Sequence, residues 1–225
     1  MSDEDRIVAA RMKLRERHLA GRAPTTPSDR ARGSGPENRH GMPKLPTGQH
    51  AVDKWPVLDL GRHPIVDPKD WQLTIDGAVE ERVTLDWSAF MALPQVDEPS
   101  DFHCVTTWSK MDLAFRGVRV RDALALARPH DDASHVMLHA YDGYTTNVSL
   151  DALIDDDVLL AHTVDGQPLP RPHGGPVRVV TPKLYAWKGA KWVNRIELLV
   201  GDQPGFWEAR GYSMTALPWD DDRYR

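Results

Sequence analysis

Residues 101–110 read Asp-Phe-His-Cys-Val-Thr-Thr-Trp-Ser-Lys and contain Cys104, the only cysteine of the chain. A lone cysteine is most often a small, buried apolar residue. The neighbours of Cys104 are polar, however, and a nearby cation would lower the pKa of its thiol. The thiolate would then be available as a nucleophile or as a soft metal ligand. This stretch leaves both an inert core cysteine and a functional thiolate open.

Residues 171–182 read Arg-Pro-His-Gly-Gly-Pro-Val-Arg-Val-Val-Thr-Pro. A double glycine ahead of a β-branched strand lets the backbone approach a ligand closely. Arg178 lies among valines, where a guanidinium needs a partner, and a phosphate would bind it through two hydrogen bonds. The alternative is an ordinary turn with a surface arginine.

Residues 183–192, Lys-Leu-Tyr-Ala-Trp-Lys-Gly-Ala-Lys-Trp, interleave three lysines with aromatic residues. Such a segment could hold a phosphate or stack on a flat ring. Alternatively, it could be an amphipathic segment whose lysines extend into solvent.

The composition excludes several classes of protein. A net charge of −5 over 225 residues argues against nucleic acid as the main partner. One cysteine cannot form an internal disulfide, and the histidines lack the spacing of a zinc site. No apolar run approaches the roughly 20 residues of a membrane span. The N-terminus has no apolar signal segment, so we predict a cytoplasmic location.

The chain divides by composition at about residue 45. Residues 6–20 predict a basic helix with a weak apolar stripe formed by Ile7, Val8, Met12, Leu14 and Leu19. Residues 21–48 are rich in Gly, Pro, Ser, Thr and Arg and predict a flexible tail, mobile or draped over the domain. We therefore predict an N-terminal helix and tail at residues 1–45 and one domain at residues 46–225.

Within that domain, short strands and short helices alternate irregularly, which predicts an α+β fold with a mixed sheet. The helices are expected at residues 85–94, with Asp86 as N-cap, and at residues 120–127. The strands are expected at residues 71–75, 101–108, 135–140, 145–150, 177–181 and 192–200.

From about residue 46 to the C-terminus, the chain resembles the molybdopterin-binding domain of the sulfite oxidase class of molybdenum enzymes. The resemblance is carried by His-Cys-Val-Thr-Thr-Trp-Ser (103–109), Asp-Gly-Tyr-Thr-Thr (142–146), His-Gly-Gly-Pro-Val-Arg (173–178), Trp-Lys-Gly-Ala-Lys-Trp (187–192) and the run 204–212. It is strongest to the compact prokaryotic sulfite oxidase-like branch. A more distant similarity is to the catalytic subunit of the periplasmic methionine-sulfoxide reductase, which has a glutamate where this chain has Thr106.

The resemblance implies a sulfite oxidase-type fold with a flexible N-terminal extension and a molybdenum–molybdopterin cofactor. It implies Cys104 as the molybdenum ligand and catalytic residue. The implied cofactor-binding residues are Trp55, Leu58, Asp59, Cys104, His173, Arg178, Gly189, Ala190 and Lys191. The candidates for the substrate side are His103, Thr106, Asp142 and Tyr144.

The predicted function is a two-electron oxygen-atom transfer on a small molecule of the sulfite or sulfoxide type. The predicted partners are this substrate and an external electron-transfer protein, with no nucleic acid and no membrane span. Two alternatives stay open at this point. One is a non-catalytic cofactor-binding or electron-transfer module of the same fold, and the other is a cofactor-free thiol enzyme in which Cys104 pairs with a histidine.

Overall fold

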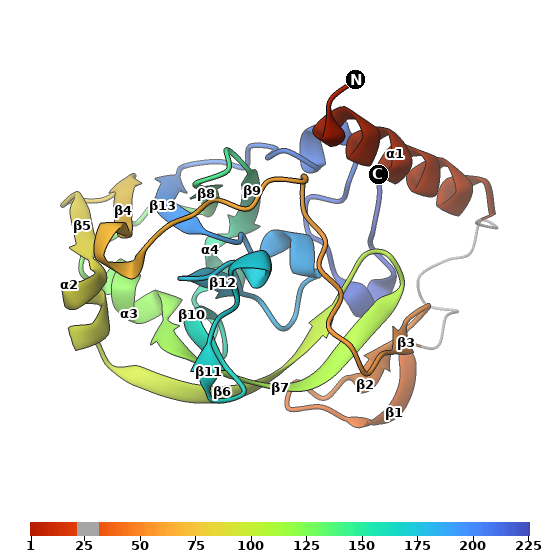
Figure 1. The fold of residues 1–225 in the computed structure, drawn as a ribbon, viewed down its shortest axis with the longest axis horizontal. Coiled ribbons are helices and arrows are strands. Elements are labelled where there is room, and N and C mark those ends of the chain that lie inside the picture. Colours follow the sequence, from red (N-terminus) through yellow and green to blue (C-terminus); the bar gives the residue numbers. More distant parts are fainter. Residues whose placement is uncertain (22–31) are drawn as a thin grey trace.

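The computed structural model of the protein describes residues 1–21 and 32–225. Part of the predicted tail, residues 22–31, lies outside this range. Figure 1 shows two larger sheets, short helices at their edges, and the long helix α1 (Asp3–Gly21) lying next to the C-terminus. The predicted α+β fold with mixed strand directions is confirmed.

A five-stranded sheet has the order β5-β4-β13-β8-β9. Its strands are β4 (Gln72–Gly77), β5 (Val83–Asp86), β8 (His135–Ala140), β9 (Thr145–Ser149) and β13 (Val193–Leu199). β13 runs parallel to β4, and the other pairs are antiparallel. Four of the predicted strands fall in this sheet, because alternation is clear there: Leu73 and Ile75 of β4 are fully buried while their neighbours are not.

The second sheet is built around β7 (Trp108–Arg119), which pairs with three strands. Its other members are β3 (His50–Ala51), β6 (Gln95–His103), β10 (Leu159–Val164), β11 (Gln167–Pro168) and β12 (Arg178–Val180). The single strand predicted at residues 101–108 is wrong. The chain turns there, with the Thr107 N–H donating to the Cys104 carbonyl (3.1 Å) and Thr107 at φ 81°.

Short helices flank the sheets. Both predicted helices are present, as α2 (Trp87–Ala92) and α3 (Val120–Ala125), and α4 (Leu150–Leu153) was not predicted. Asp86 is the N-cap of α2 as expected, since its carboxylate accepts from the Ala89 N–H at 2.8 Å. The 3₁₀ turns are η2 (Pro68–Asp70), η3 (Arg171–His173), η4 (Ala186–Lys188), η5 (Glu208–Arg210) and η6 (Pro218–Asp220).

The main core lies between the sheets and α2–α4. Its fully buried members include Trp71, Leu73, Phe90, Val118, Leu124 and Ile196. A smaller apolar cluster surrounds Cys104 and includes Trp207, Tyr212 and Tyr224 from the C-terminal segment. This second cluster forms the floor on which the candidate site is built.

The N-terminal extension is more structured than the predicted tail. The helix predicted at residues 6–20 is confirmed as α1, and the strands β1 (Gly33–Glu37) and β2 (Pro43–Pro46) form an antiparallel hairpin. Leu14 and Leu19 are each 38% exposed, so the predicted apolar stripe is wrong at these two residues.

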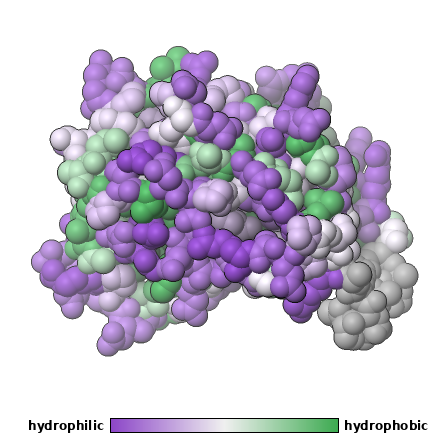
Figure 2. All heavy atoms as spheres, turned by 90° about the horizontal axis from the view of Figure 1, so that it is seen from below, coloured by the Kyte–Doolittle hydropathy of each residue, from purple (hydrophilic) through white to green (hydrophobic). Residues whose placement is uncertain are grey.

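The outer surface is mixed in character. Figure 2 shows a face on which hydrophilic residues predominate and hydrophobic ones form small groups between them. In the part of the chain that the structure describes, none of the helices has both the length and the apolar character required to traverse a bilayer.

Candidate functional site

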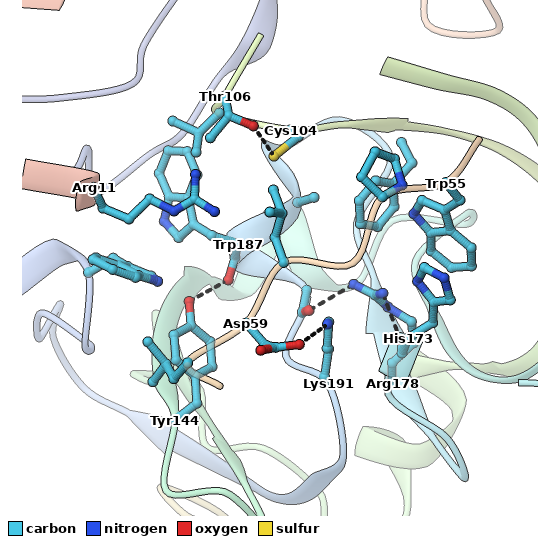
Figure 3. Close-up of a pocket in the computed structure, with 18 of the residues that line it drawn as sticks. Arg11, Trp55, Asp59, Cys104, Thr106, Tyr144, His173, Arg178, Trp187 and Lys191 are labelled. Carbon is cyan, nitrogen blue, oxygen red and sulfur yellow. Dashed lines mark hydrogen bonds and ion pairs between the residues drawn. The ribbon is translucent and has the colours of Figure 1, made fainter. Parts of the chain in front are cut away.

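A cavity that is partly open to solvent lies between the two sheets, α1 and the C-terminal segment, and its space, including the open mouth, is about 830 Å³. Its walls come from segments far apart in the sequence: α1, residues 55–60, the β6–β7 turn, the loop after β8, η3, η4 and the run 207–212. Figure 3 shows Cys104 at one side of this cavity and Arg178, Lys191 and His173 at another.

Cys104 lies on the cavity wall and is 7% exposed. Its Sγ lies 3.2 Å from Thr106 Oγ1. Burial raises the pKa of the Cys104 thiol, and the hydrogen bond from Thr106 together with the charges of Arg11 and Arg223 only partly opposes this. A nucleophilic cysteine has a lowered pKa, so this environment does not favour a cofactor-free thiol enzyme.

His103 lies behind the turn instead of in the cavity. Its Nδ1 is 2.8 Å from Ser109 Oγ, which donates to Gln49 Oε1, and Gln49 Nε2 donates to the Cys104 carbonyl. Burial lowers the pKa of His103 to about 4. The expectation that His103 lines the substrate side is wrong, because β6 is extended to its end and successive side chains point to opposite faces.

The turn at residues 104–107 is also held by residues near the C-terminus of the chain. Arg223 donates to the Val105 carbonyl, to the Gly48 carbonyl at 3.3 Å and to Asp221. The Arg223 side chain is 2% exposed. The backbone at Cys104 is thus fixed by a guanidinium from residue 223 and by an amide from residue 49, neither of which the sequence motifs singled out.

Arg178 marks the cationic side of the cavity and is 2% exposed. Its guanidinium donates to the carbonyls of His173 (3.0 Å), Val179 (3.2 Å) and Gly189 (3.1 Å), and its Cζ lies 4.8 Å from the Phe102 ring centre. Burial lowers its pKa to about 9. The group therefore keeps its charge at neutral pH.

Lys191 is the second cation on this side. Its Nζ donates to the Pro172 carbonyl at 2.7 Å and to Asp59 Oδ2 at 3.4 Å. Burial and then the charge of Arg178 lower the pKa of Lys191 to about 8, against the opposing effect of Asp59. An anion bound here would relieve the repulsion between the two cations.

The glycine turn explains how two cations come so close. Gly174 has φ +108°, and a Cβ there would lie 2.9 Å from Lys191 Cβ and 3.0 Å from Arg178 Cβ. Next to it, the His173 ring stacks on Trp55, with ring centres 3.8 Å apart and planes at 11°. The glycine leaves room for both cationic side chains.

The structure brings most of the predicted residues together around one cavity. Those that line the cavity are Trp55, Leu58, Asp59, Cys104, His173, Arg178, Gly189 and Lys191, with Thr106, Asp142 and Tyr144 from the predicted substrate side. Ala190 is fully buried in the main core instead. Four further residues line the cavity and were not predicted to do so: Trp187, Trp207 and Tyr212, which lie in stretches that carry the resemblance, and Arg11.

The chemistry of this lining suits a molybdenum–pterin group. One thiol could bind a metal, aromatic rings could contact a flat pterin, and two buried cations could bind a phosphate. Across residues 1–21 and 32–225, no three His, Cys, Asp or Glu side chains gather into a metal-binding group. A metal held here would need further ligands that come with the cofactor.

Lys191 gives this site a measurable pH dependence in cofactor-free protein. The unfolded chain protonates Lys191 near pH 10.5 and the folded chain near pH 8, so raising the pH between these values favours folding. At about 1.4 kcal/mol per pH unit, this amounts to about 3.5 kcal/mol at most. We expect the free energy of unfolding of wild type, measured in urea, to rise over this range relative to Lys191→Met. Parallel curves for the two proteins would contradict this.

The comparisons with known proteins agree with this lining. Residues 60–207 match the family described as oxidoreductase molybdopterin binding domain. The chain is 38% identical over 182 residues to the uncharacterized oxidoreductase YuiH of Bacillus subtilis, covering 80% of this chain and 92% of that protein. It is 31% identical to the protein-methionine-sulfoxide reductase catalytic subunit MsrP of Gluconobacter oxydans, over 62% of this chain and 50% of MsrP.

Two further matches are more partial. The chain is 34% identical to mouse mitochondrial sulfite oxidase, over 46% of this chain and 21% of that protein. The sulfane dehydrogenase SoxCD of Paracoccus pantotrophus has a similar fold, with a TM-score of 0.57 at 19% identity, covering 62% of this chain and 40% of the SoxCD chain. The chain spans half or less of MsrP and of sulfite oxidase.

The family match covers well over half of the chain, and YuiH is matched over most of both lengths. The protein is therefore a sulfite oxidase-like oxidoreductase of the molybdopterin-binding family, and its cofactor is molybdenum–molybdopterin.

Proposed function

We propose that the protein catalyses a two-electron oxygen-atom transfer on a small substrate of the sulfite or sulfoxide type, with Cys104 as the protein ligand of molybdenum. The observation that carries this proposal is that Cys104 is the cavity's only thiol and faces the cavity beside Thr106. The bound cofactor supplies the redox chemistry, because molybdenum can accept and return two electrons.

Other residues of the cavity would bind the cofactor. Arg178 and Lys191 would bind the phosphate of the pterin, with His173, Gly189 and Trp55 beside it. Leu58 and Asp59 would contact the pterin from the segment that precedes η2. Ala190 is buried in the core and would contribute by fixing the backbone between Gly189 and Lys191.

Thr106, Asp142 and Tyr144 would face the substrate. Burial raises the pKa of the Tyr144 hydroxyl well above 10, and this hydroxyl donates to the Trp187 carbonyl at 2.7 Å. Burial also raises the pKa of Asp142. Tyr144 therefore stays protonated and orients Trp187, while Asp142, on which the charges of Lys191 and Asp59 act, would face the substrate from the cationic side of the cavity.

An oxygen-atom transfer moves two electrons to or from the substrate, so the proposed reaction also requires an electron acceptor or donor. We therefore propose an external electron-transfer protein as a partner. A cytoplasmic location stays a prediction from the sequence.

The test is purification of the full chain from a host that makes the molybdenum cofactor. We expect about one molybdenum and one pterin per chain, and turnover of sulfite with an artificial acceptor or of sulfoxides with an artificial donor. Protein that carries molybdenum but transfers no oxygen in either direction would refute the proposed reaction. Protein that contains the pterin but never contains molybdenum would refute the proposed role of Cys104.

A further inference from the structure

Helix α1 takes part in the cavity. Arg11 lies halfway along α1, is half-buried, and is one of the cavity-lining residues. Figure 3 shows its side chain reaching from α1 into the cavity, toward the space between Thr106 and Trp187. The matched family region begins at residue 60, so this cation comes from outside it.

The inward position of Arg11 follows from how α1 docks. Val8 and Met12 pack against the apolar cluster around Cys104. Arg15 donates to the Gly211 carbonyl at 3.2 Å and to the Arg225 carbonyl at 2.7 Å. Residues spaced by three or four positions share one face of a helix, so a helix held through Val8, Met12 and Arg15 must direct Arg11 inward.

Arg11 differs from the other two cations of the cavity. Arg178 donates to three carbonyls, and Lys191 donates to a carbonyl and to Asp59. Within residues 1–21 and 32–225, the Arg11 guanidinium forms no hydrogen bond and no ion pair, and it does not stack on an aromatic ring. A guanidinium without an acceptor on a partly enclosed wall is a site for an anion.

The position of Arg11 also separates it from the phosphate end. The charge of Arg11 acts on Cys104 and Tyr212, whereas the charges that act on His173 are those of Arg178 and Lys191. Arg11 thus lies on the thiol side of the cavity. An anion bound by Arg11 would lie near Cys104, where the proposed reaction takes place.

We propose that Arg11 of α1 binds the substrate and selects a small oxyanion, of the sulfite type, over a neutral sulfoxide. This inference rests on the proposed function, because it names the substrate class for that same centre. The guanidinium would hold two oxygens of the anion and orient it toward the Cys104 side. The helix that carries Arg11 would close the wall behind the anion.

The test measures binding separately from turnover. Sulfate, an oxyanion that needs no reaction to bind, is titrated by calorimetry into cofactor-loaded full-length protein at constant ionic strength. Arg11→Met should weaken sulfate binding about tenfold or more, since a hydrogen bond to a charged group contributes that much. Arg11→Lys, which keeps the charge, should bind sulfate more tightly than Arg11→Met.

Arg17→Met is the matched control, because Arg17 is an exposed arginine of the same helix and the charge change is identical. Its sulfate affinity should equal that of wild type. The inference is overturned if Arg11→Met binds sulfate as wild type does, if Arg17→Met loses as much affinity, or if Arg11→Lys binds no better than Arg11→Met.

Kinetics separates this inference from the proposed function. In Arg11→Met, KM for sulfite should rise about tenfold while KM for dimethyl sulfoxide stays the same. Wild-type protein that turns over dimethyl sulfoxide but binds neither sulfate nor sulfite would overturn the role of Arg11 and leave the oxygen-transfer proposal intact. Protein that contains no molybdenum but still binds sulfate through Arg11 would overturn the oxygen-transfer proposal and leave the anion-binding role of Arg11 intact.

Discussion

Replacing Cys104 by serine should lower the rate of oxygen-atom transfer more than a hundredfold while the pterin stays bound. A serine oxygen is a harder and less polarisable ligand than a thiolate sulfur, and it suits the proposed metal poorly. Substitution of a residue that only orients a metal ligand lowers metal affinity or activity about 10- to 100-fold. Substitution of the ligand itself should therefore lower the activity by more than about a hundredfold. The pterin should remain because Arg178 and Lys191 are untouched.

The measurement combines turnover with molybdenum and pterin content per chain, and with X-ray absorption at the metal, which should lose one sulfur neighbour. Val105→Ala, at the next residue of the same turn, is the control for a general disturbance and should keep most of the activity. Wild-type activity with full molybdenum content in Cys104→Ser would remove Cys104 from the mechanism.

Replacing Lys188 by methionine should cost about 3–5 kcal/mol of unfolding free energy. Lys188 and Glu208 are both fully buried, with Nζ and Oε1 2.8 Å apart. Lys188 also donates to the backbone carbonyl and the side-chain oxygen of Asn147. Methionine would fill the space but leave the Glu208 carboxylate charged and without its cation.

The same carboxylate fixes part of the cavity wall, because Glu208 Oε1 also accepts from Trp187 Nε1 and Thr146 Oγ1, each at 2.8 Å. The loss of unfolding free energy is measured by urea unfolding of the cofactor-free protein.

The double variant Lys188→Met/Glu208→Gln should recover part of the loss, since no unpaired charge remains buried. Lys183→Met removes a lysine whose ion pair with Asp155 is more than a quarter exposed, and it should change stability little. A loss below about 1 kcal/mol in Lys188→Met would contradict the argument.

The fold was predictable where local signals were strong. The strand at residues 135–140 and the capping by Asp86 follow from alternation and from side-chain chemistry that act within a few residues. β7 was missed because its alternation is irregular, with a break at Asp112, which has φ 55°. Its length reflects pairing with three other strands, and no short window of sequence contains that information.

The site was predictable to the extent that its residues lie in motifs. Cys104, Arg178 and Lys191 could be named because each stands in a short distinctive stretch. His103 was misplaced because sequence proximity to a functional residue does not reveal which face a side chain occupies. Arg11 could not have been found from the sequence. The face of α1 that docks is only partly buried and contains arginines, and such a pattern is indistinguishable in sequence from a solvated basic helix.

The walls of the cavity run from Arg11 to Tyr212, and this spread has a consequence for biosynthesis. Chains are made from the N-terminus onward, so Trp207 and Tyr212 leave the ribosome roughly 100 residues after Cys104. Arg223, which holds the Val105 carbonyl, emerges later still. A complete receptor for the cofactor therefore exists only after nearly all of the chain has been synthesised. Insertion of the cofactor should follow translation, and chains stalled before residue 207 should remain empty.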